Sequence, residues 1–210
     1  MPLRDGLVRD AGGVVRCWWC GDSEDYVRYH DTEWGVPVTS DVRLFEKLSL
    51  EGFQAGLSWL TILRKREAFR SGFAGFDPVR VARFTARDVT RLLGDAGIVR
   101  HRGKIESVIN NARCYPELCA EFGSLSAFIW SFEPPAKERN APSRRSEIPA
   151  IVPSSVAMSK ALKQRGWKFV GPTTMYALFQ AMGLVNDHLE GCFRRLEVAR
   201  MRAAGAARHR

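Results

Sequence analysis

Cysteine and histidine residues near the two ends of the 210-residue chain are candidates for metal binding. His188 and Cys192 are four residues apart, so on a helix they would share one face. Cys17 and His30 lie near the start of the chain, and together the four residues make a Cys2His2 set that suits tetrahedral zinc. Four protein ligands leave no open coordination position, so such a zinc would be structural and would tie the N-terminal region to the C-terminal region.

This spacing does not by itself decide the ligands. Cys17 and Cys20 form a CxxC pair, so Cys20 could replace one of the four ligands. Buried thiols and hydrogen-bonded histidines would give the same pattern without a metal. The five cysteines are odd in number and scattered, and in an intracellular chain we expect them to be core residues or metal ligands rather than disulfides.

A single acid, Glu51, stands in the mostly apolar stretch from Leu50 to Trp59. It is either a structural acid whose hydrogen bonds are satisfied within the protein, or a group that recognises the hydrogen-bond donors of a substrate. A carboxylate in an apolar pocket suits a base that carries N–H groups and positive charge, and Trp59 offers a stacking face. Tyr26 and Tyr29 flank His30; they line the same pocket or are core aromatics.

Two glycine-containing stretches, 92–104 and 169–174, are typical of tight turns between helices. Glycine lets backbone N–H groups approach a phosphate, and the N-terminus of the following helix favours an anion. In the first stretch, basic side chains add charge for phosphate contacts that do not depend on base sequence: Arg100, Arg102 and Lys104. The alternative is an ordinary interhelical turn beside a solvated run of charge.

The elements that must position these residues are helices. Four helices are expected where helix-capping residues precede apolar residues at helical spacing: at Thr39–Asp41, Ser58, Asp77-Pro78 and Thr85. Further helices are expected near 104–115, after 124, from 154 or 155 to 162, and after 168–174. Alternating strand patterns are missing, so the predicted fold class is all-α. The proline-rich stretch 133–153 is predicted to be a long loop.

Composition and charge narrow the class of protein. Hydrophobic residues make up 45% and charged residues 26%, which is typical of a globular domain or of two small lobes sharing a cleft. The net charge of +9 favours a nucleic-acid partner, although arginine richness from the host genome would look the same. With no apolar run of about 18 residues and no signal peptide, we expect no membrane contact and a cytoplasmic location.

Taken together, these residues resemble the 3-methyladenine DNA glycosylase I family of the helix-hairpin-helix DNA glycosylase superfamily. The matching stretches cover most of residues 17–193 in the family's order: Tyr29–Pro37, Glu51–Trp59, Asp95–Lys104, Phe128–Phe132 and Phe169–Cys192. The glycosylase domain is therefore expected at 17–193. Residues 1–16 are expected to be a poorly ordered extension, and 194–210 a basic tail, either a frayed helix or a disordered arm. Phe53 departs from the polar residue expected in the family.

The resemblance implies two small helical lobes around a cleft and one structural zinc per chain, held by Cys17, His30, His188 and Cys192. It also implies a pocket for an extruded base. That pocket would be made by Glu51 as the catalytic residue, with Tyr29, Trp59 and nearby Tyr26. The resemblance further implies contact with double-stranded DNA, with the turn at Gly56 and Leu57 inserted into the duplex. The remaining DNA-binding residues would be Arg100, Arg102, Lys104, Gly171 and Thr173.

The implied activity is base-excision repair: hydrolysis of the N-glycosidic bond of 3-methyladenine in alkylated DNA, with release of the free base. The enzyme would be a monofunctional glycosylase without lyase activity, and we expect it to act as a monomer. One alternative is a non-catalytic helical zinc protein that binds damaged DNA. Another is a zinc-stabilised helical interaction protein whose charge only keeps it soluble.

Overall fold

The computed structural model describes residues 3–139 and 141–206. The chain forms two compact units. Unit 1 comprises residues 1–38, 133–153 and 179–210, and unit 2 comprises residues 39–132 and 154–178. The predicted all-α class is confirmed, because the described residues contain eleven α-helices, short 3-10 turns and one two-stranded sheet. Among the described residues, every helix is too short or too polar to cross a membrane.

Unit 1 begins with a β-hairpin, where sequence analysis predicted a poorly ordered extension. Strands β1 (Leu7–Arg9) and β2 (Val15–Cys17) pair antiparallel, with Leu7 opposite Cys17. The backbone N–H of Phe193 donates to the carbonyl of Val15 at 3.0 Å, so the hairpin is hydrogen-bonded to the C-terminal region. The prediction for residues 3–16 was therefore wrong: strands of three residues are too short to show a clear periodicity.

Unit 1 also contains α1 (Glu24–Thr32) and α11 (Arg194–Ala206), with 3-10 turns η1 (Trp18–Cys20), η3 (Ala136–Glu138) and η4 (Arg145–Glu147). The basic tail is thus helical as far as Ala206; residues 207–210 lie outside the described part. Arg202 of α11 donates to the carbonyl of Leu184 at 2.6 Å and to Glu133 at 2.8 Å. These bonds fix α11 against the rest of unit 1.

Gly183 joins the N-terminal and C-terminal segments of unit 1. Its φ is +81°, and a Cβ there would lie 2.6 Å from the nitrogen of Pro37 and 2.8 Å from the carbonyl oxygen of Gly35. Beside it, Val38 N–H donates to the carbonyl of Met182 at 3.2 Å. Only glycine combines this left-handed conformation with so close a backbone approach.

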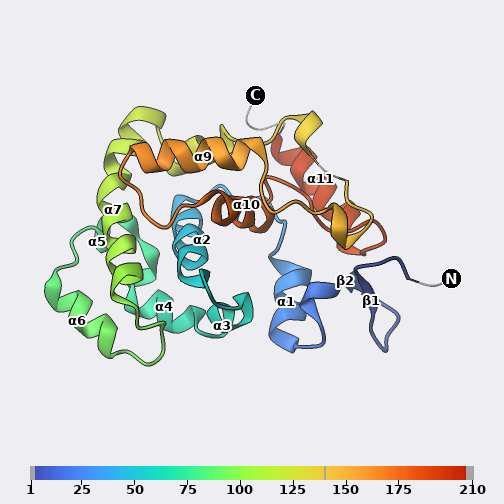
Figure 1. Ribbon diagram of the computed structural model, residues 1–210, viewed down its shortest axis with the longest axis horizontal. Helices are drawn as coiled ribbons and strands as arrows, with labels where there is room; N and C mark the ends of the chain where they lie inside the picture. The colour runs from blue at the N-terminus through green and yellow to red at the C-terminus, as the bar shows by residue number, and fades with distance from the viewer. Residues whose placement is uncertain (1–2, 140, 207–210) are drawn as a thin grey trace. The chain divides into compact units, whose positions relative to one another are not determined.

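Unit 2 is a helical array built around a phenylalanine core (Figure 1). It contains α2 (Asp41–Gln54), α3 (Trp59–Arg64), α4 (Arg66–Gly72), α5 (Pro78–Val81), α6 (Ala86–Gly94), α7 (Arg102–Phe122), α8 (Leu125–Trp130), and nearly all of α9 (Pro153–Gln164) and most of α10 (Pro172–Ala181). Phe53 is fully buried, with its ring 4.6 Å from that of Phe69 and 5.8 Å from that of Phe73. Phe53 is therefore a core residue.

Three of the predicted helix caps in unit 2 are confirmed, whereas Ser40, the N-cap residue of α2, makes no side-chain capping hydrogen bond. Ser58 Oγ accepts from the N–H of Thr61 at 3.2 Å, and Asp77 accepts from the N–H of Val79 at 2.9 Å. Thr85 and Asp88 form the expected capping box at the start of α6. These side chains satisfy backbone donors that a helix leaves unpaired at its first turn, so the helix boundaries follow from the sequence.

Candidate base-binding and metal sites

Glu51 lies in the last turn of α2, where its side chain is buried. Lys47, one helical turn earlier, places its ammonium 2.8 Å from Glu51 Oε1. Residues four apart on a helix share a face, so the regular geometry of α2 is enough to make this ion pair. Lys47 was not singled out from the sequence, although its spacing from Glu51 predicts the pair.

Trp59 is the first residue of α3 and is also buried. The Lys47 ammonium lies 3.2 Å from the centre of the Trp59 ring, in cation–π contact. One ammonium therefore touches both the carboxylate of Glu51 and the face of Trp59. Unit 2 brings together these two sequence-predicted residues, and adds a cation between them.

A short turn joins α2 to α3 and carries an exposed leucine. Gly56 has a φ of +82°, and the space where a Cβ would project is open. Leu57 follows it and is 41% exposed. The N–H of Leu57 donates to the carbonyl of Gln54 at 2.7 Å, which closes the turn. The glycine is needed here for its left-handed backbone, and the turn presents an apolar side chain to solvent.

Lys104 was expected to contact DNA phosphate, but its side chain does not face solvent. Its side chain is buried, and the ammonium donates to the carbonyls of Phe53 at 2.9 Å and Ala55 at 2.6 Å. Burial lowers the pKa of this ammonium. Lys104 thus satisfies the carbonyls that the end of α2 leaves unpaired, and this corrects its assignment. The sequence shows that Lys104 follows two other basic residues, but whether its side chain is buried depends on how α7 packs against α2.

The loop between α6 and α7 carries the other two basic candidates. Arg100 and Arg102 are both exposed, and Arg102 pairs with Glu106 at 3.3 Å. The ammonium of Lys65 donates to the carbonyl of Ala96 at 2.8 Å, which holds the loop against the end of α3. The loop is therefore fixed, while its two arginines face solvent.

The turn between α9 and α10 is fixed by α7. Asn111 accepts from the N–H of Lys168 at 2.8 Å and donates back to its carbonyl at 3.0 Å. Phe169 follows with a φ of +57° and is 40% exposed. Gly171 is partly buried, and Thr173 is exposed in the first turn of α10. This stretch has the helix–turn–helix form that sequence analysis predicted.

The two tyrosine candidates belong to α1, in unit 1, whereas Glu51 and Trp59 belong to unit 2. Tyr29 is buried and Tyr26 is partly buried. Both contact the edge of Trp19, with ring centres 5.7 Å away for Tyr26 and 6.2 Å away for Tyr29. Within unit 1 they are members of an aromatic cluster beside His30.

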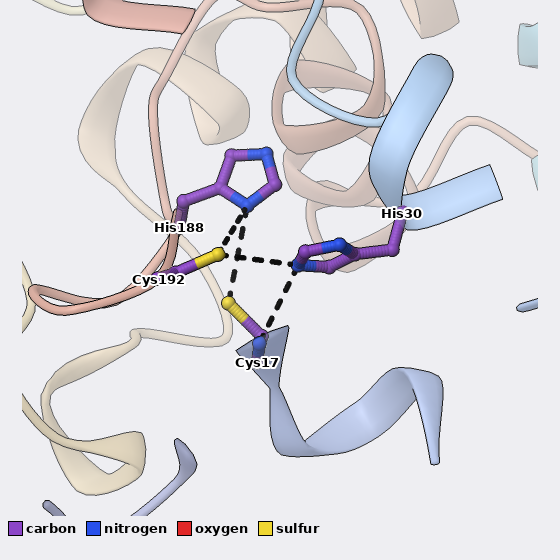
Figure 2. Close-up of side chains that lie close together, drawn as sticks. All are labelled: Cys17, His30, His188 and Cys192. Atoms are coloured by element: carbon purple, nitrogen blue, oxygen red, sulfur yellow. Dashed lines mark hydrogen bonds between the residues drawn. The ribbon is translucent and has the colours of Figure 1, made fainter. Parts of the chain in front are cut away.

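The four predicted metal ligands meet in unit 1. The ligand atoms of Cys17, His30, His188 and Cys192 all lie within 4.8 Å of one another, and all four residues are buried. Figure 2 shows the two sulfur atoms facing the two imidazole rings. Cys192 Sγ is 3.4 Å from His30 Nε2 and 3.5 Å from His188 Nδ1, and Cys17 Sγ is 3.9 Å from His188 Nδ1.

These separations fit a tetrahedral zinc site. Zinc bonds of the usual length to sulfur and nitrogen at tetrahedral angles place the two ligand atoms about 3.6 Å apart. The outer nitrogens of the imidazoles are also held: His30 Nδ1 lies 2.7 Å from Asp31, and His188 Nε2 lies 3.1 Å from the carbonyl of Trp34. Such partners fix the ring orientation that metal binding needs.

Cys20 is outside the cluster. Its thiol donates to the carbonyl of Cys17 at 3.0 Å, so the alternative in which Cys20 replaces a ligand does not match the geometry. The thiols of the cluster are strongly perturbed. Contact with Cys192 and burial raise the pKa of Cys17, while the Cys17 thiol and the two imidazoles lower the pKa of Cys192. Two cysteines and two imidazoles in one buried cluster are a suitable donor set for zinc, which binds cysteine as the thiolate.

Comparisons with known proteins identify the family of the chain. The sequence model of the methyladenine glycosylase family matches residues 19–195. The chain belongs to this family. Escherichia coli (strain K12) DNA-3-methyladenine glycosylase 1 is 51% identical over 179 residues, which is 85% of this chain and 96% of that protein.

Solved structures agree as well. A crystal structure of a 3-methyladenine DNA glycosylase I is 49% identical, with a TM-score of 0.81, over 85% of this chain and 98% of that one. The Staphylococcus aureus enzyme, solved to explain 3-methyladenine recognition, is 38% identical with a TM-score of 0.82, over 86% of this chain and 96% of that one. The family match includes Glu51 and Trp59, and begins two residues after Cys17.

The contacts of Lys104 give a prediction about stability. Replacing Lys104 with methionine keeps the apolar stem but leaves the carbonyls of Phe53 and Ala55 without this donor. We expect the free energy of unfolding to fall by about 1–3 kcal/mol, as measured by urea denaturation. The matched control is Arg102→Met on the exposed face of the same helix turn, which should change it by less than about 0.5 kcal/mol. Equal effects of the two substitutions would contradict the structural role of Lys104.

Proposed function

We propose that this member of the methyladenine glycosylase family hydrolyses the bond between N9 of 3-methyladenine and deoxyribose in alkylated double-stranded DNA, and releases free 3-methyladenine. The observation that carries the proposal is the buried carboxylate of Glu51 meeting the face of Trp59, in a chain whose relatives are named for this activity. A carboxylate beside an indole suits a flat base with N–H donors and positive charge.

The bond cleavage needs little chemical assistance from the protein. Methylation at N3 makes the base cationic in DNA and therefore a good leaving group. The C1′–N9 bond breaks, its electron pair moves onto the base, water adds to C1′, and a proton is lost. Hydrolysis by water leaves the DNA backbone intact, so the enzyme is monofunctional without a lyase step. The protein mainly has to extract the base from the duplex and hold it.

Glu51 is the catalytic residue of the proposal, because it touches the base. Its carboxylate accepts hydrogen bonds from donors of the methylated base and interacts with its charge, while Trp59 stacks on the ring. The family resemblance also assigns Tyr29 and Tyr26 of unit 1 to base binding. Unmodified adenine is neutral and its glycosidic bond is much harder to break, so discrimination comes partly from the pocket and partly from the reactivity of the damaged nucleotide.

Base extrusion is assigned to the exposed turns of unit 2. The side chain of Leu57, presented by Gly56, fills the gap that the extruded nucleotide leaves in the duplex. The two helix–turn–helix stretches, which we assign as helix-hairpin-helix elements, bind phosphates through Arg100, Arg102 and the turn at Gly171 and Thr173. Lys104 contributes indirectly, because it holds the end of α2 from which the Leu57 turn projects.

The Cys2His2 cluster is proposed to bind one structural zinc ion per chain. The fit of the thiolate and imidazole separations to tetrahedral coordination supports zinc, and the four ligands leave no position for a substrate. Bound zinc would fix the N-terminal hairpin and α1 to the segment before α11. The ion takes no part in the bond cleavage.

The role of Glu51 is tested by Glu51→Gln. Loss of the charged acceptor should weaken binding of free 3-methyladenine, followed by NMR titration, and lower excision from methylated DNA by about tenfold or more. The control is Glu46→Gln, a buried acid on the same helix that pairs with Arg70 at 2.8 Å. We expect the control to excise within about threefold of the native rate.

The same assay separates the alternatives. A non-catalytic DNA-damage-binding protein would bind methylated duplex without releasing free 3-methyladenine. A helical interaction protein would show no affinity for duplex DNA at all. Unchanged affinity for 3-methyladenine in Glu51→Gln would remove Glu51 from the base site.

The role of Leu57 is tested by Leu57→Ala. Without the apolar wedge, we expect excision from duplex DNA to fall by about tenfold, because extrusion is less favourable, while binding of the free base stays unchanged. Val79→Ala is the matched control, since Val79 is 51% exposed on α5 of the same unit. A duplex rate that does not differ between the two variants would exclude insertion by Leu57.

Zinc binding is tested by elemental analysis of the purified protein, which should give one zinc per chain. Cys192→Ser should lose the metal and unfold at a lower temperature, because metal binding contributes directly to folding free energy. Cys20→Ser, which changes a buried thiol outside the cluster, should keep the metal. A metal-free native protein of unchanged stability under chelation would reject the site.

A further inference from the structure

Arg16 connects the N-terminal hairpin to the surroundings of the Cys2His2 cluster. It lies in β2 next to the cluster residue Cys17, and its side chain is 12% exposed. Successive side chains of a strand point to opposite faces, so Arg16 and Cys17 leave the hairpin in different directions. Arg16 precedes the start of the family match by three residues, so the match gives it no role. Its contacts nevertheless lead back to the cluster from outside, through α1.

The first of these contacts is with Asp31 of α1. Arg16 Nε donates to the two carboxylate oxygens of Asp31 at 2.9 and 3.0 Å, and Arg16 Nη2 donates to Asp31 Oδ2 at 2.8 Å. A planar guanidinium that binds both oxygens fixes the direction of a carboxylate as well as its position. Asp31 Oδ1 in turn lies 2.7 Å from His30 Nδ1. The carboxylate of Asp31 is therefore held between a guanidinium and an imidazole.

Asp31 determines which nitrogen of His30 is free to bind a metal. A carboxylate only accepts hydrogen bonds, so the imidazole proton is assigned to Nδ1, the nitrogen beside Asp31. The lone pair of Nε2 is then available, and Nε2 is the nitrogen that lies 3.4 Å from Cys192 Sγ in the cluster. Hydrogen-bond partners of this kind fix both the tautomer and the ring orientation of a histidine ligand.

Two further contacts hold Arg16 itself in place. Arg16 Nη1 pairs with Asp10 of the hairpin at 2.5 Å. The guanidinium carbon lies 5.4 Å from the centre of the Phe193 ring, in cation–π contact, and Phe193 directly follows the cluster residue Cys192. The guanidinium is thus fixed by the hairpin, by α1 and by the C-terminal region at once. Its orientation toward Asp31 does not depend on a single contact.

We infer that Arg16 is a positioning residue of the proposed zinc site: through Asp31 it holds His30 in the tautomer and orientation that zinc binding requires, and thereby slows the loss of the ion. This inference rests on the proposed function, because it takes the Cys2His2 cluster as the site of a structural zinc. Arg16 touches none of the four ligand atoms that surround the ion, so its effect on the metal has to pass through its neighbours.

The test measures how fast zinc leaves the folded protein. The full-length, zinc-loaded protein is mixed with an excess of a chromophoric chelator, and zinc release is followed by absorbance. Arg16→Gln should release zinc about 10- to 100-fold faster than the native protein, because the loss of an outer partner of a ligand changes metal affinity by that factor. The control is Arg28→Gln, which removes an exposed arginine of α1 that pairs with Asp25 and should stay within about threefold of the native rate.

A double-mutant cycle separates action through Asp31 from a general effect on stability. Asp31→Asn should also release zinc faster, and adding Arg16→Gln to it should raise the rate by less than about threefold more, because the connection to His30 is already broken. In NMR spectra of the zinc-loaded protein, the Nδ1–H resonance of His30 should shift in Arg16→Gln and stay in place in Arg28→Gln. If Arg16 only stabilised the fold, its effect would multiply fully with that of Asp31→Asn and this resonance would not move.

Arg16→Lys is a second variant that keeps the charge if the glutamine variant does not fold. One ammonium cannot bind both oxygens of Asp31 and also reach Asp10, so zinc release should again be faster than in the native protein, by at least about threefold. Native release rates in the folded Arg16 variants, full multiplication in the cycle, or an equal effect of Arg28→Gln would overturn the role of Arg16 and leave the zinc site standing. A native protein that binds no zinc would remove the metal site, and the inference with it.

Discussion

The buried cluster of two thiols and two imidazoles is the constraint on which unit 1 depends. It joins Cys17 and His30 to His188 and Cys192, and all of unit 2 lies between them in sequence. Four polar groups in a buried position are costly unless each is paired, by hydrogen bonds or by a metal ion. The β-hairpin, α1 and the start of α11 therefore have to assemble together, because each contributes to the surroundings of the same four side chains.

The proposed base site of unit 2 differs from this cluster, because its residues are close together in sequence. Lys47, Glu51 and Trp59 lie within thirteen residues, on the end of α2 and the start of α3. Helix periodicity sets the first contact, and the turn that Lys104 holds from α7 sets the second. The proposed base-binding residues of unit 2 thus lie on a short segment whose end is held by one long-range cation, whereas the cluster of unit 1 depends on contacts between distant parts of the chain.

Sequence reasoning succeeded where the determining interactions were local or the residue chemistry was distinctive. The caps at Ser58, Asp77 and Thr85 were predicted from neighbouring residues, and the Cys2His2 cluster was predicted because few side chains bind metals as cysteine and histidine do. Lys104 was misassigned because a lysine near a glycine turn has the same pattern whether it faces solvent or a helix end. The N-terminal hairpin was missed because its strands are held by the C-terminal region, which local periodicity does not report.

Charge is used differently on the surface and in the base site of this protein. The net charge of +9 and exposed side chains such as Arg100 suit attraction to the DNA backbone, which needs positive charge but no exact placement. Around Glu51 the charges are instead paired at short distance in a buried position. A leaving group that is already activated by methylation needs no strong acid or base from the protein. The proposed base site can therefore select its substrate through binding rather than through general acid catalysis.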